Sequence, residues 1–166
     1  MHIHIAELNA GLGKELPFSF TTAAADIDAT AADYAFEGPI EVEGHVTNTG
    51  TGYRVEGVIR ARKRFICDRC LEECLETQEH AFSEMFRQGT PAEDDDANFF
   101  DGDEIELQEL VRDTLLAAQP LSNICKPDCK GLCPVCGANL NHGDCGCDRF
   151  VPDPRLAALQ QFQAKE

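Results

Sequence analysis

Basic residues are scarce in this sequence of 166 amino acids. It has 14 lysines and arginines against 30 aspartates and glutamates, which gives a formal net charge of −16 at pH 7. A protein that binds polyanions over a broad surface needs an excess of positive charge, so this composition argues against a general nucleic-acid-binding surface. Any contact with RNA must therefore be local and must depend on a small group of basic side chains.

Long hydrophobic runs are also absent, although 43% of the residues are apolar. No stretch is apolar over the length that a membrane-spanning helix requires, and neither end carries a lipidation motif. The opening residues, M-H-I-H-I-A-E, contain neither the basic nor the apolar region of a secretory signal. We therefore expect a cytoplasmic protein with no membrane partner, built as one domain or as a domain with a small appendage.

A clustered set of catalytic residues is missing as well. The histidines are scattered along the chain without a nucleophile or an acid at a spacing typical of turnover; they are His2, His4, His45, His80 and His142. A lone histidine near a cysteine-rich loop, such as His142, is more often a surface residue or a neighbour of the ligands than a ligand itself. The sequence thus predicts a protein that is not an enzyme and has no small-molecule substrate.

Cysteine, by contrast, is abundant. Six of the nine cysteines fall in the stretch C-K-P-D-C-K-G-L-C-P-V-C-G-A-N-L-N-H-G-D-C-G-C at 125–147. Cys133 and Cys136 are spaced as C-x-x-C, and Gly137 can adopt the positive φ of a knuckle turn that aims both sulfurs at one point. Tetrahedral Zn²⁺ needs two such pairs, and the closing C-G-C supplies the second. A zinc site closed by four thiolates is structural, because no position is left for a reacting water.

A second C-x-x-C, formed by Cys67 and Cys70, lies at a turn between two expected strands and lacks a complete ligand set of its own. Cys125 and Cys129 can complete it. The cysteines then divide into two zinc sites of four, with Cys74 left over: Cys67, Cys70, Cys125 and Cys129 in one, and Cys133, Cys136, Cys145 and Cys147 in the other. A rival scheme places Cys129 in the distal site and leaves Cys67 and Cys70 without metal. One or two zinc ions per chain are therefore expected.

Other interpretations of these cysteines remain open. Disulfides are typical of small secreted scaffolds rather than of a cytosolic chain. A redox C-x-x-C would lie in a βαβ unit, whereas Cys133 lies in a loop rich in Gly, Pro and Asn, and an iron–sulfur cluster would use the same thiolates as zinc. Cys67, Cys70 and Cys74 could also be reactive thiols, because the neighbouring Arg69 favours a thiolate. The alternative function is thus a thiol-redox or metal-handling protein.

Alternating apolar and polar residues predict the secondary structure. The runs at 40–46 and 53–67 alternate in this way on either side of the turn T-N-T-G-T-G, so they are expected to form a β-hairpin, and 75–87 a further strand. An acidic loop is expected over 88–103. From 106 to 118 the apolar residues lie at the spacing of one helix face, which predicts an amphipathic helix.

The expected fold class is α+β: an antiparallel β-sheet or partly open barrel with one or two helices and a C-terminal zinc-knuckle extension. Residues 1–120 are expected to form the β-rich core domain, 121–150 the cysteine-rich zinc-binding segment, and 151–166 a C-terminal helix. Two short extended pieces are expected within 3–20. The segment at 21–35, rich in Ala, Thr and Asp, is expected to be a loop or a frayed helix.

The second strand of the hairpin carries the main concentration of basic side chains, with Lys63 close by. The residues expected to contact a partner are Arg54, Arg60, Arg62, Arg64 and Arg69. Guanidinium groups bind phosphate oxygens through paired hydrogen bonds, so these arginines could contact RNA or an acidic partner. The alternative is a ladder of salt bridges with Glu41 and Glu43 of the other hairpin strand.

Several motifs follow one another in a characteristic order. The basic strand runs into C-x-x-C-L at 67–71, followed by an acidic loop, the helix I-E-L-x-E-L-V-R-D-T-L-L-A-A-x-P-L, the run C-K-G-L-C-P-V-C-G-A-N-L-N at 129–141 and a closing C-x-C. From about residue 40 onward this order resembles the YceD family of large ribosomal RNA subunit accumulation proteins.

The resemblance implies a bacterial or plastid protein that is needed for normal amounts of large-subunit ribosomal RNA. It also implies that the two C-x-x-C pairs belong to different sites, because some members keep the first pair and lack the distal cluster. The expected function is a non-enzymatic, zinc-stabilised factor that promotes large-subunit ribosomal RNA accumulation and ribosome assembly. Its expected partner is the precursor of the large ribosomal subunit, contacted through ribosomal RNA or a basic ribosomal protein.

Overall fold

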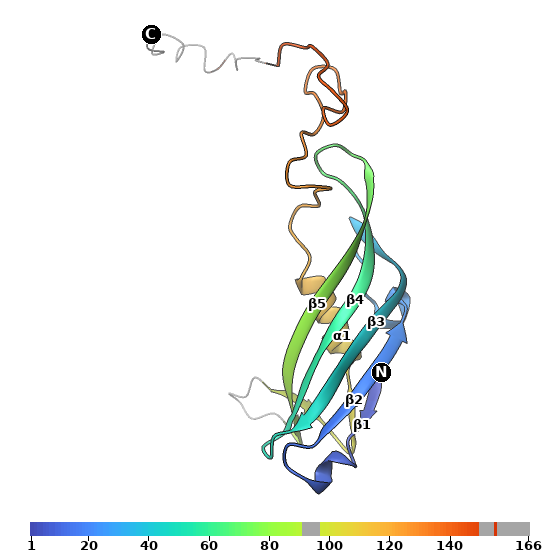
Figure 1. Ribbon diagram of the computed structural model, residues 1–166, viewed down its shortest axis with the longest axis vertical. Coiled ribbons are helices and arrows are strands. Elements are labelled where there is room, and N and C mark those ends of the chain that lie inside the picture. Colours follow the sequence, from blue (N-terminus) through green and yellow to red (C-terminus); the bar gives the residue numbers. More distant parts are fainter. Residues whose placement is uncertain (91–96, 150–154, 156–166) are drawn as a thin grey trace. The chain divides into compact units, whose positions relative to one another are not determined.

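The structure, a computed structural model, describes residues 1–90, 97–149 and 155 (Figure 1). The chain divides into two compact units. The first unit consists of Met1–Ile66 and Glu73–Asn123, and the second consists of Cys67–Glu72 and Ile124–Glu166. The connection between two strands of the first unit thus belongs to the second unit, together with the cysteine-rich segment.

A five-stranded sheet forms the centre of the first unit, in the order β2-β3-β4-β5-β6. Neighbouring strands are antiparallel, except that β5 and β6 are parallel, and the sheet is not closed. Its strands are β2 (Glu15–Thr22), β3 (Tyr34–Asn48), β4 (Tyr53–Ile66), β5 (Glu73–Gln88) and β6 (Asn98–Phe100).

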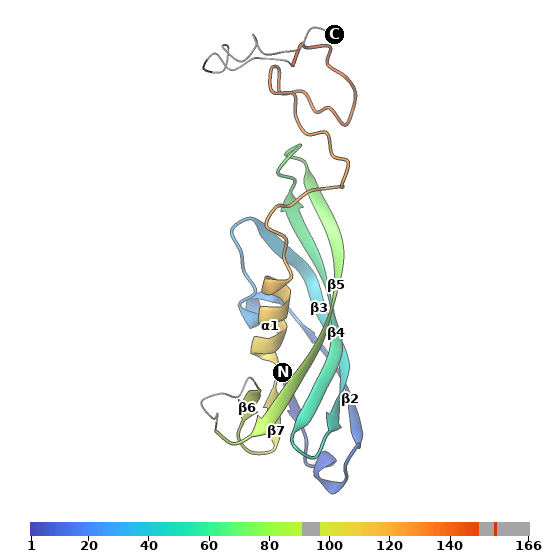
Figure 2. The ribbon, with the colours of Figure 1, turned by 90° about the vertical axis from the view of Figure 1, so that its left-hand side faces the viewer.

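Smaller elements accompany one face of this sheet, as Figure 2 shows for α1 (Gln108–Ala117). Strand β1 (His2–His4) pairs with β7 (Glu104–Glu106) in a separate two-stranded sheet. Two 3-10 helices, η1 (Leu8–Ala10) and η2 (Ala24–Ile27), contact β3, and η2 also contacts α1. These elements enclose the hydrophobic core against the sheet.

The alternation of side chains along β3 and β4 decides which face of the sheet is covered. Val42, Val46, Val55 and Ile59 are fully buried and belong to one hydrophobic cluster with residues of α1. Charged and polar residues at the intervening positions lie on the opposite face. Successive side chains of a strand point to opposite faces of the sheet. The apolar residues at every second position therefore all face the core.

Two glycines stand opposite each other in β3 and β4 on the core side of the sheet. A Cβ on Gly57 would lie 2.5 Å from the carbonyl oxygen of Glu43 and 2.8 Å from the ring of Phe82, and a Cβ on Gly44 would lie 2.7 Å from the ring of Phe18. The missing side chains therefore make room for two aromatic rings, one from each neighbouring strand. Glycine is required here by close approach rather than by a special backbone angle.

Lys63 is the exception to the apolar pattern of the buried stripe. Only 1% of it is exposed, its Nζ lies 2.6 Å from Oδ1 of Asn123, and the ring centroids of Tyr34 and Phe65 lie 4.5 Å and 5.2 Å away. The amide oxygen and the aromatic faces offset part of the cost of burying a charge. Lys63 therefore faces the core and not the exposed arginines that neighbour it in the sequence.

The predicted α+β class is confirmed, with an open, mainly antiparallel sheet and one α-helix among the described residues. The expected hairpin is formed by β3 and β4, the further strand is β5, and α1 lies within the expected 106–118. Two expectations differ from the structure. The loop expected over 88–103 contains β6, and β7 occupies the position where the helix was expected to begin. Strands of three residues are too short for an alternating apolar–polar pattern to be recognised in the sequence.

The segment at 21–35, expected to be a loop or a frayed helix, is irregular between the end of β2 and the start of β3 except for η2, a short 3-10 helix whose Ile27 belongs to the core. The expected C-terminal helix over 151–166 lies outside the described residues, apart from Arg155. Residues 91–96, which include four consecutive acidic residues, lie outside them as well. The sequence-based domain division 1–120, 121–150 and 151–166 stays a prediction.

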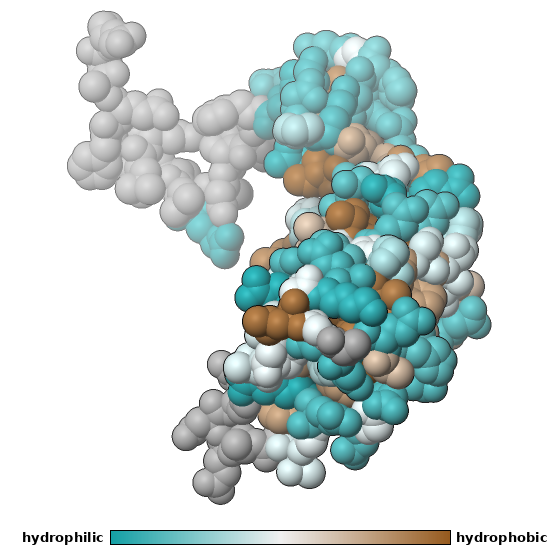
Figure 3. All heavy atoms as spheres, turned by 60° about the horizontal axis from the view of Figure 1, so that its bottom comes forward, coloured by the Kyte–Doolittle hydropathy of each residue, from teal (hydrophilic) through white to brown (hydrophobic). Residues whose placement is uncertain are grey.

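Hydrophilic residues cover most of the face seen in Figure 3, with apolar residues in smaller groups between them. This surface agrees with the 27% of charged residues in the sequence. In the part of the chain that the structure describes, no helix is both long and apolar enough to span a membrane.

Candidate metal centre

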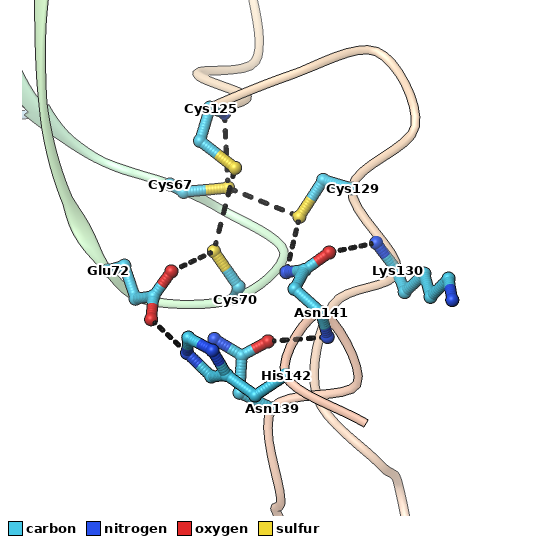
Figure 4. Close-up of polar contacts among 9 residues, drawn as sticks. All are labelled: Cys67, Cys70, Glu72, Cys125, Cys129, Lys130, Asn139, Asn141 and His142. Atoms are coloured by element: carbon cyan, nitrogen blue, oxygen red, sulfur yellow. Dashed lines mark hydrogen bonds and ion pairs between the residues drawn. The ribbon is translucent and has the colours of Figure 1, made fainter. Parts of the chain in front are cut away.

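Four cysteine sulfurs converge within the second unit, and we call them the proximal group (Figure 4). Cys67 and Cys70 come from the connection between β4 and β5, and Cys125 and Cys129 come from the cysteine-rich segment. All four sulfurs lie within 4.8 Å of one another. The Sγ atoms of Cys67 and Cys129 are 3.9 Å apart, and those of Cys70 and Cys125 are 3.7 Å apart. A tetrahedral Zn²⁺ with Zn–S bonds of about 2.3 Å separates its sulfurs by about 3.8 Å, so the spacing fits one metal ion.

Four further sulfurs form the distal group, again within 4.8 Å of one another: those of Cys133, Cys136, Cys145 and Cys147. The structure therefore gathers the cysteines in the two sets of four that the spacing indicates, and not in the rival scheme that moves Cys129 to the distal site. None of the nine cysteines forms a disulfide, and Cys74 lies outside both groups. Each group is able to hold one metal ion.

The two C-x-x-C pairs fold into the same knuckle turn. The N–H of Leu71 donates to the carbonyl oxygen of Cys67 at 2.9 Å, and the N–H of Gly137 donates to that of Cys133 at 2.8 Å. The residue after the second cysteine has a positive φ in both turns, 58° at Leu71 and 74° at Gly137. The sequence predicts this conformation for the glycine. It does not predict it for a leucine, which rarely adopts a left-handed backbone.

Backbone N–H groups favour a thiolate at one cysteine of each group. Burial opposes ionisation of Cys67, but N–H donors, including that of Cys125 at 3.3 Å, outweigh it and lower the pKa of Cys67 to about 6. The N–H groups of Cys136 and Val135 likewise lower the pKa of Cys133 to about 6. Because a metal binds the thiolate and not the thiol, each group is prepared for a cation at neutral pH.

Other thiols of the two groups respond in the opposite direction. Burial, followed by the neighbouring sulfurs, raises the pKa of Cys125, and the adjacent Cys136 and Cys145 raise the pKa of Cys147 to about 12. Four sulfurs at these distances resist full ionisation because negative charges would accumulate at one point. A divalent metal ion removes this repulsion and allows all four to ionise.

Asn141 connects the distal segment to the proximal group. Its Nδ2 donates to the sulfur of Cys129 at 3.3 Å, and this hydrogen bond is the main cause of the lowered pKa of Cys129. Its Oδ1 accepts from the N–H of Lys130 at 2.9 Å, which fixes the amide orientation. Asn141 lies between Cys136 and Cys145, so the loop closed by the distal group also supports the proximal group.

A carboxylate and a histidine form a second contact of this kind. One oxygen of Glu72 lies 3.7 Å from the sulfur of Cys70, and the other lies 2.8 Å from Nε2 of the exposed His142 (Figure 4). His142 is thus a neighbour of the ligands, as the sequence indicates. Glu72 and Asn141 are not recognisable from spacing alone, although Asn141 ends the quoted motif at 129–141 and Glu72 directly follows the one at 67–71.

One backbone and one side-chain hydrogen bond join the Cys67–Glu72 turn to the segment that begins at Cys129. The N–H of Leu132 donates to the carbonyl oxygen of Arg69 at 3.1 Å, and Nη1 of Arg69 donates to the carbonyl oxygen of Cys129 at 3.1 Å. Gly131, with φ of 72°, passes so close that a Cβ would lie 3.0 Å from the same oxygen of Arg69. Arg69 therefore stabilises the proximal group by joining the two segments that carry its cysteines.

The other predicted arginines alternate along the exposed face of β4. Arg60 bridges Glu43 and Glu79 on the two neighbouring strands, at 2.8 Å and 3.0 Å. Arg64 is similarly placed between Glu37 and Glu73, at 2.7 Å and 3.6 Å. These pairs are the cross-strand ladder that the sequence leaves open as an alternative, although the glutamates are largely not those expected.

Arg54 and Arg62 complete the set on this face. Both side chains are exposed, and neither makes an ion pair with a described residue. Arg54 stands opposite Thr47 and Met85, and Arg62 stands opposite Glu37 and Thr77. The sheet register therefore divides the arginines into two that are neutralised by glutamates and two that keep their charge available.

Comparison with known proteins gives a family match. A family model described as large ribosomal RNA subunit accumulation protein YceD matches residues 55–163. The chain is 27% identical over 169 residues to a protein of Arabidopsis thaliana named large ribosomal RNA subunit accumulation protein YCED homolog 1, chloroplastic, with 81% of this chain and 53% of that protein covered.

Bacterial relatives give a similar degree of likeness. Proteins named uncharacterized from Mycobacterium tuberculosis (strain ATCC 25618 / H37Rv) and Mycobacterium bovis (strain ATCC BAA-935 / AF2122/97) are each 29% identical over 132 residues, with 76% of this chain and 63% of each protein covered. The chain thus spans between 53% and 63% of the length of these relatives. No solved structure gives a significant match.

Proposed function

Because the chain belongs to the YceD family, we propose that it is a non-enzymatic cytoplasmic factor that promotes the accumulation of large-subunit ribosomal RNA during ribosome assembly. The observation that carries this proposal is the family match over residues 55–163, which includes most of β4, all of α1 and both cysteine groups. The chemistry of the cysteine groups agrees with it. Four thiolates around one ion leave no coordination position for a substrate or a reacting water, so they serve the fold.

The metal in this proposal is zinc, at two ions per chain. Sulfur–sulfur distances of 3.7 Å and 3.9 Å in the proximal group suit a single tetrahedral ion. An iron–sulfur cluster is larger than one ion and would hold its cysteine sulfurs farther apart. Both groups are built on knuckle turns, which are typical of structural zinc sites.

Contact with the precursor of the large subunit is assigned in this proposal to the arginines predicted from the sequence. Arg54 and Arg62 are the main contributors on β4, since Arg60 and Arg64 are engaged by glutamates. The net charge of −16 opposes tight binding to free RNA, so the contact is expected to form within a particle that already holds ribosomal proteins.

Sedimentation of the protein through a gradient of cell extract tests this assignment. We expect the wild-type protein to migrate with precursors of the large subunit at low salt and to be released as salt rises. The variant Arg54→Gln/Arg62→Gln should be released at a lower salt concentration. Arg60→Gln/Arg64→Gln removes the same charge from the same strand and should have a smaller effect. Wild-type protein that stays at the top of the gradient at low salt would contradict the proposal.

A further inference from the structure

A pocket of about 660 Å³ opens in the first unit, beside β6, β7 and the start of α1. Its apolar lining comes from Phe86, Phe99, Phe100 and Leu110. Phe86 and Phe100 are 5% and 9% exposed and belong to the hydrophobic core, so this part of the pocket is a fixed surface. The pocket is therefore suited to an elongated apolar group that can lie along aromatic rings.

The rest of the lining is acidic. Its charged residues are Asp101, Glu104, Glu106 and Glu109, with His2 beside them. No lysine or arginine lines the pocket among the described residues. Glu104 and Glu106 contact His2 at 3.7 Å and 3.9 Å, and Glu104 also contacts His4 at 3.1 Å.

This distribution differs from that of the exposed face of the sheet. On that face Arg60 and Arg64 each neutralise a pair of glutamates. At the pocket, Glu109 makes a longer contact of 3.8 Å with Arg112, and the partners of Glu104 are histidines, which carry charge only when protonated. The pocket therefore keeps a negative potential that a cationic group can neutralise.

A lysine or arginine side chain matches both parts of the lining. Its aliphatic stem can lie along the phenylalanine rings while its cationic head reaches the carboxylates, and aromatic faces attract cations as well. A nucleic acid does not match, because its phosphates would approach at least four carboxylates. Charge complementarity thus selects a basic polypeptide over RNA at this surface.

We propose that this pocket docks a lysine- or arginine-bearing segment of a basic protein of the large-subunit precursor. This inference rests on the proposed function for the identity of the particle, and it adds the class of partner and the surface that receives it. The protein would then face the precursor with two distinct surfaces of the first unit, an arginine-bearing face of the sheet and an acidic pocket.

Fluorescence anisotropy with a labelled peptide tests the proposal on the full-length, metal-loaded chain. The probe is a capped peptide of about 12 residues in which Arg and Lys alternate with Leu and Gly, and a matched peptide carries Glu at the basic positions. We expect salt-dependent binding of the basic peptide and none of the acidic peptide. The variant Glu104→Gln/Glu106→Gln should weaken binding at least about tenfold, which corresponds to the loss of one charge-assisted hydrogen bond.

The control variant is Glu15→Gln/Glu41→Gln, which makes the same change in net charge at exposed residues of β2 and β3. It should change the affinity less than about twofold. Equal weakening by both variants would reduce the effect to overall charge and overturn the proposal, as would absence of peptide binding. Binding of a single-stranded RNA of similar length in competition with the peptide would also overturn it, in favour of RNA as the occupant.

Failure of this test can be distinguished from failure of the proposed function. The peptide assay uses purified protein and reports on the pocket alone. The proposed function is judged by ribosomal RNA amounts in cells, which do not depend on the identity of the pocket's occupant.

Discussion

Leu71 adopts a backbone conformation that is unfavourable for its residue type. It has the left-handed φ of 58° in the proximal knuckle, where the distal knuckle has Gly137. For a residue with a Cβ this conformation costs roughly 1–2 kcal/mol. The side chain is 63% exposed, so packing recovers little of that cost. The left-handed turn is closed by the hydrogen bond from the N–H of Leu71 to the carbonyl oxygen of Cys67 at 2.9 Å, and it is not favoured by the local preference of leucine.

Replacing Leu71 with glycine should therefore strengthen the proximal site. Relief of the left-handed strain is partly offset by the larger backbone entropy of glycine in the unfolded chain, about 0.4–1 kcal/mol. The net gain of roughly 0.5–1 kcal/mol corresponds to about two- to fivefold tighter zinc binding in competition with a chelator. The reverse change in the distal knuckle, Gly137→Leu, should weaken zinc binding. Weaker binding by Leu71→Gly would show that the side chain stabilises the turn through contacts.

At the scale of elements, the loop closed by the distal group also serves the proximal group. Asn141 binds the sulfur of Cys129, and His142 binds Glu72, which contacts Cys70. Both residues lie between Cys136 and Cys145 in the sequence. The distal group thus positions residues that support the first site, a role beyond that of an independent stabiliser.

The contact through Asn141 gives a measurable coupling. Outer hydrogen bonds to metal ligands typically contribute 10- to 100-fold in metal affinity, so Asn141→Ala should weaken zinc binding at the proximal site by about that factor. The distal zinc should be retained. Asn98→Ala, at an exposed asparagine of the first unit, serves as the control and should leave both affinities unchanged. Equal affinities in Asn141→Ala and wild type would contradict the coupling.

The two cysteine groups should also be separable by stoichiometry. Native mass spectrometry is expected to find two zinc ions per chain, and one ion in either Cys70→Ser or Cys136→Ser. The core of the first unit contains none of the grouped cysteines, so its thermal unfolding should persist in both variants. Structural zinc contributes on the order of 10–16 kcal/mol to small sites, so the affected knuckle should lose its amide protection. A single zinc in the wild-type chain would disprove the two-site arrangement.

Long strands can be predicted from the sequence of this chain, whereas its short strands and side-chain contacts cannot. Strands β3 and β4 are 15 and 14 residues long, so their alternation is clear from the sequence. The cysteine spacing predicts two sets of four, but it also allows Cys129 in the distal set, and the structure gathers Cys129 with Cys67, Cys70 and Cys125. Strands β6 and β7 have three residues each and depend on pairing with distant partners. The contact between Glu72 and His142 cannot be predicted for the same reason, because it joins residues 70 positions apart in the sequence. Register across strands likewise decides that Arg60 and Arg64 are neutralised while Arg54 and Arg62 are not.

At the scale of the whole molecule, the chain combines a strong negative charge with a small set of available arginines. The formal net charge is −16, and two of the four arginines on the exposed face of β4 are engaged by glutamates. Such a protein is poorly suited to bind free RNA and better suited to a particle that presents RNA and basic protein together. For this reason the proposed function assigns contact with a precursor particle, and not with free RNA, to this chain.

The ratio of large-subunit to small-subunit ribosomal RNA after depletion of the protein tests the central claim most directly. We expect the ratio to fall, and to recover when the wild-type chain is supplied again. Cys70→Ser should restore it less well than Cys74→Ser, because Cys74 lies outside both metal groups. A ratio that stays at its normal value after depletion would contradict a role in large-subunit ribosomal RNA accumulation.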